Sequence, residues 1–317
     1  MKKEYAIGAD IGGTNIQFCI LDNTGEIHDF FSIPSEAHKG RAQTLKNLLQ
    51  GVNKILASNT RTNFKGIGVG SPGLINEKGK VVTGAENLPG WNGAEIKKYL
   101  EKHTGLYTHV ENDVTALALG EAKFGAGKNY RNIICLAFGT GLGGGIVFDN
   151  KIYRGKYGYA AEFGHIVVNP NGPKCSCGNN GCLETYASTV GLKRIVKEKL
   201  KNKKNSKLLK LAENNINNIT PKLLFDEYKK NNKEAKEIIN EMGHYLGIGI
   251  GIITNIFDPD VIILAGGISK AGKTLIDIIK KNSVPYLLPF YRNKLNIKIS
   301  KFKDKAGVIG TASLVFE

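Results

Sequence analysis

The sequence has no long hydrophobic run. No stretch approaches the ~18 consecutive apolar residues that mark a transmembrane helix, so we expect no membrane partner. The N-terminal Met1-Lys2-Lys3 could begin a signal peptide, but Glu4 and Asp10 interrupt any apolar core of the required length. We therefore expect a cytoplasmic protein.

Acidic and aromatic residues are scarce where the chain is most basic. The sequence holds 44 Lys and Arg residues against 28 Asp and Glu, a formal net charge of +16. Residues 193–210 contain one acid, Glu198, and no aromatic side chain on which single-stranded nucleic acid could stack. We interpret the Lys- and Asn-rich segment 193–218 as a solvated helix and loop and expect no nucleic-acid partner. Contact with another polyanion stays open.

Cysteine is also scarce, but three of the five residues lie between positions 175 and 182. In a reducing cytosol such a cluster indicates a metal site rather than disulfides. With His165, the residues Cys175, Cys177 and Cys182 form a Cys₃His set that suits structural, tetrahedral Zn²⁺ with no open position. Paired Cys-x-x-Cys knuckles are absent, so free cysteines in a loop remain the alternative.

Glycine, in contrast, is abundant, with 39 residues clustered in a few loops. One glycine loop, residues 10–15, lies between two β-rich runs, and residues 139–145 repeat this arrangement in the second half. The internal repeat indicates two related lobes facing a shared cleft. Strands and helices alternate along the rest of the chain, which predicts an α/β architecture.

The two glycine loops are expected to bind the phosphates of ATP. Their glycines present backbone N–H groups without interfering side chains. Thr14 and Thr140 add hydroxyl donors, and Asp10 can hold Mg²⁺ through water. A plain structural turn would explain one such loop equally well. The expected nucleotide-binding residues of the two loops are Asp10, Gly12, Gly13, Thr14, Gly139, Thr140, Gly141 and Gly143.

Two glycine patterns match other kinds of nucleotide site. Gly139-x-Gly141-x-x-Gly144 fits the dinucleotide fingerprint, but residues 146–149 are predicted as a strand where that motif requires a helix. Residues 267–274 match the Walker A pattern, but only 43 residues follow Thr274, fewer than a P-loop fold needs. We interpret this Walker-like stretch as a coincidental match, and whether it contacts nucleotide stays open.

The stretch Glu162-Phe-Gly-His165 is followed by a stretch rich in cysteine and glycine at residues 175–184. These two stretches resemble the signature of the ROK family of bacterial sugar kinases and sugar-responsive repressors. The resemblance runs essentially end to end, and length and motif order are most similar to those of the family's glucokinases. Further matching stretches are Asp10-x-Gly-Gly-Thr14, Asn87-Leu-Pro-Gly-Trp91, Glu111-Asn112-Asp113, Gly120-Glu121, Leu264-Ala-Gly-Gly-Ile-Ser269 and Ala306-Gly-Val-Ile-Gly310.

The resemblance implies a two-lobed, actin-like (ribonuclease H-like) ATPase fold with the active site in the cleft between the lobes. The small lobe is expected at 1–118 plus 303–317, with the first phosphate loop and the catalytic Asp. The large lobe is expected at 119–302, with the second phosphate loop, the zinc loop and an adenosine pocket. The resemblance also gives Gly266 and Gly267 a place in that adenosine pocket.

The activity implied by the resemblance is Mg-ATP-dependent phosphorylation of a hexose, with glucose as the preferred interpretation. N-acetylmannosamine, N-acetylglucosamine, fructose and allose are the alternative substrates. The alternative from another class is a sugar-binding transcriptional regulator. It is disfavoured because the first phosphate loop begins at Asp10, which leaves no room for an N-terminal helix-turn-helix. We expect a homo-oligomer, a dimer or a tetramer.

Asp113 is the candidate general base. It lies between a strand predicted at 107–110 and a helix predicted from Val114, so an N-cap role explains an Asp there equally well. The match of Asn112-Asp113 to the family's catalytic pair favours the base. One ring nitrogen of His165 is expected on zinc and the other on a sugar hydroxyl. The sugar ligands implied by the resemblance are Asn87, Asn112, Asp113, Glu162, His165 and Glu184.

Two sequence features leave questions that the family match does not answer. Val114-Thr115 follows the catalytic pair where the family often has Ala-Asn, which could alter the helix packing behind the pocket. The single tryptophan, Trp91, fits either the mouth of the cleft or the protein core.

Overall fold

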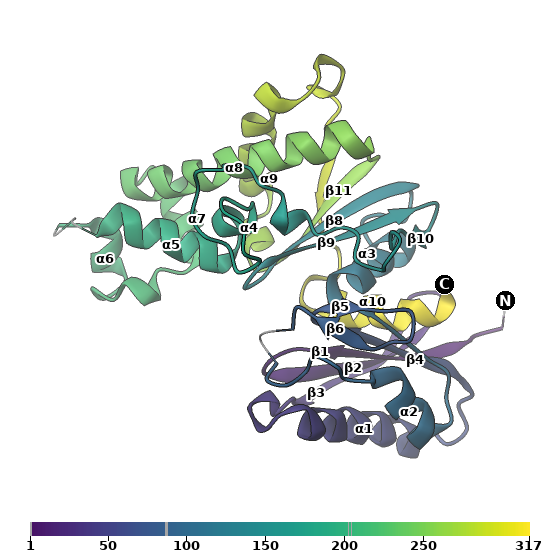
Figure 1. Cartoon of the computed structure of the whole chain (residues 1–317). Coiled ribbons are helices and arrows are strands. Elements are labelled where there is room, and N and C mark those ends of the chain that lie inside the picture. Colours follow the sequence, from purple (N-terminus) through teal and green to yellow (C-terminus); the bar gives the residue numbers. More distant parts are fainter. Residues whose placement is uncertain (1, 86–87, 202, 204) are drawn as a thin grey trace. The chain divides into compact units, whose positions relative to one another are not determined.

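The computed structural model describes residues 2–85, 88–201, 203 and 205–317 (Figure 1). The chain divides into two compact units. Unit 1 comprises Met1–Cys135, Gly145–Ala161 and Ser300–Glu317, and unit 2 comprises Leu136–Gly144 and Glu162–Ile299.

The two units are not divided at the boundary expected for the lobes. That boundary, between residues 118 and 119, falls inside helix α3 (Asp113–Phe124). The assignment of 1–118 plus 303–317 and of 119–302 to the two lobes therefore stays a prediction.

Unit 1 is built on a five-stranded mixed sheet. Strand β1 (Tyr5–Ile11) pairs antiparallel with β2 (Asn15–Asp22) and parallel with β4 (Phe64–Ser71). The first glycine loop is therefore the tip of a hairpin, as predicted. The register places Asp10 opposite Gln17 at the tip and Tyr5 opposite Asp22 at the far end. The strand order is β3 (Ile27–Pro34), β2 (Asn15–Asp22), β1 (Tyr5–Ile11), β4 (Phe64–Ser71) and β7 (Thr108–Asn112).

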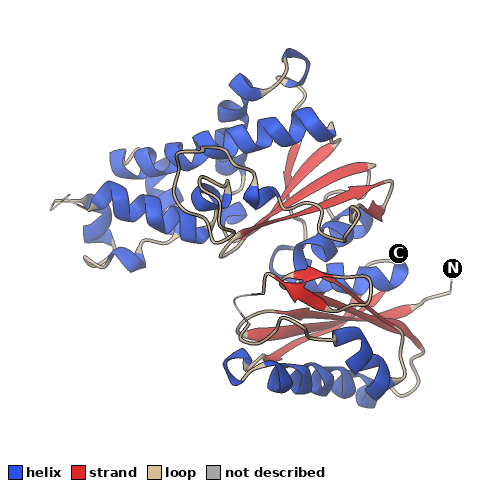
Figure 2. Cartoon of the chain, in the orientation of Figure 1, coloured by secondary structure: helices blue, strands red, loops and turns tan. Residues whose placement is uncertain are grey.

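Helices cover both faces of this sheet. Helices α1 (Arg41–Ser58) and α2 (Ile96–Thr104) pack on one face, and α3 and α10 (Ala306–Ser313) on the other (Figure 2). The α10 face needs glycine because the helix lies very close to β4. A Cβ on Gly68 would lie only 1.8 Å from the carbonyl oxygen of Thr311. The glycines of β4 therefore allow close helix–sheet packing.

A second five-stranded sheet runs in the order β10 (Lys151–Ile152), β9 (Leu142–Phe148), β8 (Asn132–Phe138), β11 (Val261–Gly266) and β12 (Ile297–Ile299). Strand β9 follows the loop at Gly139, so a strand leaves this loop, as predicted, and the dinucleotide fingerprint lacks its helix. A short hairpin pairs β5 (Leu74–Ile75) with β6 (Val81–Thr83). The helices of unit 2 are α4 (Glu184–Ala187), α5 (Thr189–Leu200), α6 (Lys207–Leu211), α7 (Pro221–Lys229), α8 (Lys233–Phe257) and α9 (Lys273–Ser283).

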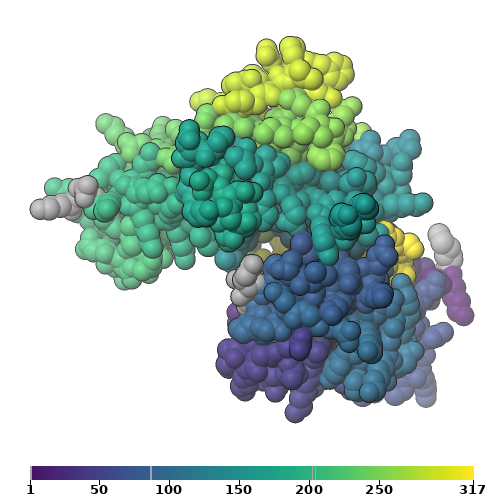
Figure 3. All heavy atoms as spheres, in the orientation of Figure 1, coloured from purple at the N-terminus to yellow at the C-terminus, as the bar shows by residue number. Residues whose placement is uncertain are grey.

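Much of the described part of the basic segment lies on α5 and α6, and acids of α8 neutralise part of its charge. Lys199 pairs with Glu241 at 2.7 Å, and Lys203 pairs with Glu237 at 3.0 Å. In Figure 3 the described residues of α5 and α6 lie toward one end of unit 2. These pairs fit the interpretation of the segment as a solvated face. Among the described residues, no helix is both long and apolar enough to cross a membrane.

Candidate functional site

The tip of the β1–β2 hairpin holds the first glycine loop in a fixed turn. The N–H of Gly12 donates to the carbonyl of Asn15 at 2.9 Å, and the hydroxyl of Ser35 donates to the carbonyl of Gly13 at 2.8 Å. Gly13 and Thr14 are exposed at the tip. The turn therefore presents backbone and a hydroxyl to solvent on a rigid strand pair, which suits phosphate binding.

Two glycines flank the side-chain carboxylate of Asp10. A Cβ on Gly307 would lie 2.2 Å from Asp10 Oδ2, and a Cβ on Gly70 would lie 3.2 Å from Oδ1 and 3.4 Å from the Cα of Asp113. Burial, reinforced by the nearby charge of Asp113, raises the pKa of Asp10 from 3.8 to about 7. A bound cation would stabilise this carboxylate as an anion, so the donor fits Mg²⁺ held through water.

Asp113 is the first residue of α3, and Asn112, not Asp113, caps this helix. The side-chain oxygen of Asn112 accepts the N–H groups of Val114 and Thr115 at 3.0 and 3.1 Å. Capping therefore does not require the carboxylate of Asp113, although that group also accepts the N–H of Val114 at 2.9 Å. Burial raises the pKa of Asp113, against the opposing effect of the Val114 bond. A raised pKa makes a carboxylate a stronger proton acceptor, which suits a general base.

The second glycine loop is held by Glu184, one of the predicted sugar ligands. Glu184 Oε2 accepts the N–H of Leu142 at 2.8 Å, and a Cβ on Gly141 would lie 2.3 Å from the same oxygen. The N–H of Thr189, at the start of α5, donates to the carbonyl of Gly139 at 3.0 Å. One Glu184 oxygen is therefore committed to shaping the loop.

Gly266 and Gly267 lie beside the second glycine loop. The N–H of Gly267 donates to the carbonyl of Phe138 at 2.8 Å, and a Cβ on Gly266, which has φ of 83°, would lie 2.3 Å from that oxygen. The structure thus brings the glycines predicted for the adenosine pocket next to Gly139. The Walker-like stretch continues as a 3₁₀ helix, Ile268–Ala271, followed by α9 from Lys273.

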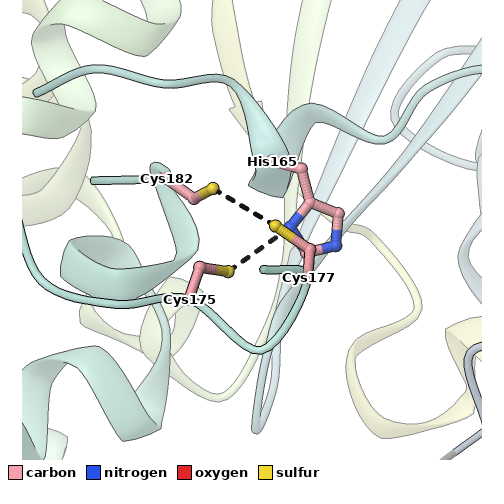
Figure 4. A group of neighbouring side chains, drawn as sticks. All are labelled: His165, Cys175, Cys177 and Cys182. Atoms are coloured by element: carbon pink, nitrogen blue, oxygen red, sulfur yellow. Dashed lines mark hydrogen bonds between the residues drawn. The ribbon is translucent and has the colours of Figure 1, made fainter. Parts of the chain in front are cut away.

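The predicted zinc ligands point toward one another (Figure 4). One ligand atom from each of His165, Cys175, Cys177 and Cys182 lies within 4.8 Å of all the others. The sulfurs of Cys177 and Cys182 are 3.6 Å apart, and His165 Nδ1 is 3.6 Å from the sulfur of Cys175. With Zn–S bonds of about 2.3 Å, tetrahedral geometry requires edges of this size. The donor set therefore fits a closed zinc site.

The two ring nitrogens of His165 face different groups. Nδ1 is the atom directed at the cysteine sulfurs, whereas Nε2 lies 3.8 Å from Glu162 Oε2. This geometry leaves Nε2 beside another predicted sugar ligand. Asn87, also predicted as a sugar ligand, lies outside the described residues.

Comparisons with known proteins identify the family of the chain. The model of the ROK family matches residues 6–317. The chain belongs to the ROK family. A curated glucokinase of Halalkalibacterium halodurans is 36% identical over 99% of this chain and 96% of that protein. A xylose repressor of Caldicellulosiruptor bescii is 31% identical over 98% of this chain and 77% of the repressor.

A solved ROK-family structure gives the same fold. The glucokinase of Streptomyces griseus, crystallised with glucose and AMPPNP, has a TM-score of 0.81 and 33% identity, and the match covers 98% of each chain. The α/β class and the two-lobed, actin-like fold expected from the sequence are thereby confirmed.

Three residues of this ROK-family chain have roles that the sequence did not reveal. Trp91 is 1% exposed, and its indole N–H donates to Ser71 Oγ at 2.8 Å, so it belongs to the core. Glu121 is fully buried and accepts the hydroxyl of Ser300 at 2.6 Å. Arg154 pairs with Glu111 at 2.7 Å across 43 positions of sequence. Trp91 and Glu121 lie in the family-like stretches Asn87-Leu-Pro-Gly-Trp91 and Gly120-Glu121, but no local pattern identified the partners of the three residues, because these partners are remote in sequence.

Proposed function

We propose that the protein is an ATP-dependent glucokinase that converts glucose to glucose 6-phosphate. The similarity that carries this proposal extends over the full chain: 36% identity to a glucokinase and 33% to a glucokinase crystallised with glucose and an ATP analogue. The site residues described above supply the groups that such a reaction needs. Phosphoryl transfer requires in-line positioning, neutralisation of phosphate charge and a carboxylate that accepts the hydroxyl proton.

Asp113 takes the role of the base in this proposal. Its carboxylate would accept the proton of the attacking sugar hydroxyl, and its raised pKa brings it closer to the working pH. The side-chain oxygen of Asn112 caps α3, so Asn112 would bind the sugar through its Nδ2 group. This Nδ2 group also donates to the carbonyl of Gly73 at 3.2 Å. Asn112 therefore holds both the helix start and the loop after β4.

The nucleotide and its metal ion would lie against the two glycine loops. Bound Mg²⁺ supplies charge neutralisation for the phosphates. Asp10 would hold the ion, with Gly12, Gly13 and Thr14 on one phosphate group. Gly139, Thr140, Gly141 and Gly143 would contact another, and Gly266 and Gly267 would contact the adenosine.

The Cys₃His cluster would hold a structural zinc ion. With Nδ1 of His165 committed to the ion, Nε2 is left for a sugar hydroxyl, next to Glu162 and in the same unit as Glu184. Metal analysis of purified protein should give one zinc per chain. Zinc-free protein that is fully folded and active would contradict this assignment.

Two finer expectations belong to the same proposal. Another hexose, such as N-acetylmannosamine, N-acetylglucosamine, fructose or allose, is the alternative substrate. A homo-oligomer in the cytoplasm, a dimer or tetramer, is the expected state. A sugar-responsive regulator is the second candidate function, supported by the 31% identity to a xylose repressor.

A coupled ATP-consumption assay tests the proposal. Purified protein with Mg-ATP is assayed on glucose, N-acetylmannosamine, N-acetylglucosamine, fructose, mannose, allose and xylose. Turnover that is fastest with glucose is the expected result. Preference for another hexose keeps the kinase and corrects the substrate. Sugar binding in calorimetry without any turnover, in protein that contains zinc, would favour the regulator.

A further inference from the structure

An ion-pair cluster in unit 1 lies directly behind the segment that carries Asp113. Arg154 donates from Nε to Glu111 Oε2 at 2.7 Å and from Nη2 to Glu317 Oε2 at 2.7 Å. Glu111 is 4% exposed, and its other oxygen accepts the N–H of Asn112 at 3.0 Å. One buried carboxylate therefore connects Arg154 to the residue that precedes Asp113.

Net stability is a poor explanation for this cluster. Moving charged groups out of water costs about as much as their attraction returns, so a well-packed apolar pair would serve stability equally well. Burial raises the pKa of Glu111 even though the Arg154 charge opposes that shift. A cluster that is costly to desolvate but geometrically precise suits the positioning of another group.

The geometry identifies that group as Asp113. Glu111 and Asn112 are the last two residues of β7, paired with Gly70 and Ser71 of β4, and Asp113 is the first residue of α3. The Glu111 carboxylate holds the N–H of Asn112 from the strand side, and the Asn112 side chain holds the first turn from the helix side. Arg154 in turn holds the Glu111 carboxylate in place.

We propose that Glu111 and Arg154 are positioning residues that hold the Asn112–Asp113 junction, and hence the Asp113 carboxylate, in its reactive place. The inference rests on the proposed kinase activity, with Asp113 as its base. A displacement of about 1 Å can cost on the order of 10²-fold in rate, so loss of either residue should slow phosphoryl transfer more than it weakens sugar binding.

The test is the single-turnover rate of glucose phosphorylation by the full chain with Mg-ATP. Arg154→Ala and Glu111→Gln should lower this rate by about 10–100-fold and change the KM for glucose by less than about threefold. Asn112 and Arg154 donate to different oxygens of Glu111, and Gln keeps an acceptor oxygen at only one of these two positions, so one of the two bonds is lost. Arg154→Lys keeps the positive charge but lacks the guanidinium group that donates to two carboxylates at once, so it should recover only part of the rate.

Lys97→Ala is the matched control. Lys97 lines the same cavity of 210 Å³ as Arg154 and Glu111, and its own carboxylate partner, Glu101, is 4.0 Å away. This variant removes one positive charge from the cavity that Arg154 and Glu111 also line, and it leaves the bonds of Glu111 in place, so it should keep the wild-type rate within about twofold. The cavity also leaves room for a guanidinium ion, which should restore part of the rate of Arg154→Ala but none of the rate of Glu111→Gln.

Each outcome decides the inference. Wild-type rates in Arg154→Ala and Glu111→Gln, with only a lower melting temperature, would reduce the cluster to a structural role and overturn the proposal. An equal loss in Lys97→Ala would also overturn it, because the effect would then be one of charge. If Arg154→Ala does not fold, the shape-preserving Glu111→Gln carries the test. An inactive wild type would refute the kinase proposal and this inference together, whereas an active wild type with unaffected variants refutes this inference alone.

Discussion

The two ends of the β1–β2 hairpin carry aspartates with opposite electrostatics. At the far end, Asp22 Oδ1 accepts the N–H of Thr24 at 2.9 Å and of Glu26 at 3.0 Å, and Oδ2 lies 2.8 Å from His28 Nε2. Burial alone would raise the pKa of Asp22, but the hydrogen bonds from Thr24, His28 and Glu26 hold it well below the usual 3.8. At the tip, burial and Asp113 raise the pKa of Asp10 to about 7.

We interpret the contrast as one between a structural carboxylate, Asp22, and a proposed functional carboxylate, Asp10. The chain surrounds Asp22 with donors that stabilise its charge, so the group closes the hairpin. It surrounds Asp10 with glycines and a second carboxylate, which leaves the charge to be stabilised by something that binds. Perturbed carboxylates of the second kind cluster at functional sites. Four substitutions, from the largest expected effect to the smallest, test this contrast.

Asp113→Ala should have the largest effect, because it removes the proposed base, which lies near Asp10. We expect turnover to fall by about 10²–10⁴-fold in the coupled assay. The melting temperature and the zinc content should match the wild type, since Asn112 still caps α3. Near-normal turnover would remove Asp113 from the mechanism.

Asp22→Ala should have the converse effect at the structural end. It leaves several donors without their acceptor, so the free energy of unfolding in urea should fall by about 3 kcal/mol at neutral pH. The folded pKa lies below the unfolded value of 3.8, so this stabilisation is present above that value and is lost as the pH falls. Turnover per folded molecule should be unchanged; a specific loss of turnover would make Asp22 part of the site.

Asp10→Asn should stabilise the protein while impairing catalysis. Between pH 3.8 and about 7, folded Asp10 keeps a proton that the unfolded chain releases, so wild-type stability falls as the pH rises through this window. Without Mg²⁺ the variant should be more stable by about 1–3 kcal/mol at pH 8 and equal to the wild type near pH 4. Urea unfolding at both pH values measures this. A variant less stable than the wild type at pH 8 would place Asp10 with Asp22 among the structural carboxylates.

Lys273→Ala should have the smallest effect. Lys273 is exposed at the start of α9, after the 3₁₀ turn that replaces an open phosphate loop. We expect turnover and stability within about twofold and ~0.5 kcal/mol of the wild type. A loss as large as that of Asp113→Ala would show that the Walker-like stretch binds nucleotide.

Local patterns in the sequence were enough to predict two hairpins and a candidate set of zinc ligands. Two β-rich runs around a glycine loop predict a hairpin wherever they occur, so both hairpins, with tips at 10–15 and 139–145, could be placed without the fold. The Cys₃His set was equally readable, because three of its four members fall within eight residues. The family motifs extended this to the fold class and to the activity proposed here.

Only the tertiary structure decided which residues support the site. The local sequence pattern left a cap and a base equally open for Asp113, and only the resemblance to the family favoured the base. The structure shows that the strand reaches Asn112 and that this residue caps the helix, so the cap no longer requires Asp113. The role of Asp113 as the base stays a prediction. The partners Glu111 and Arg154 are separated by 43 positions, and Glu121 and Ser300 by 179. Such pairs leave no local spacing to detect, because they are formed when the sheet, its helices and the C-terminal segment pack together.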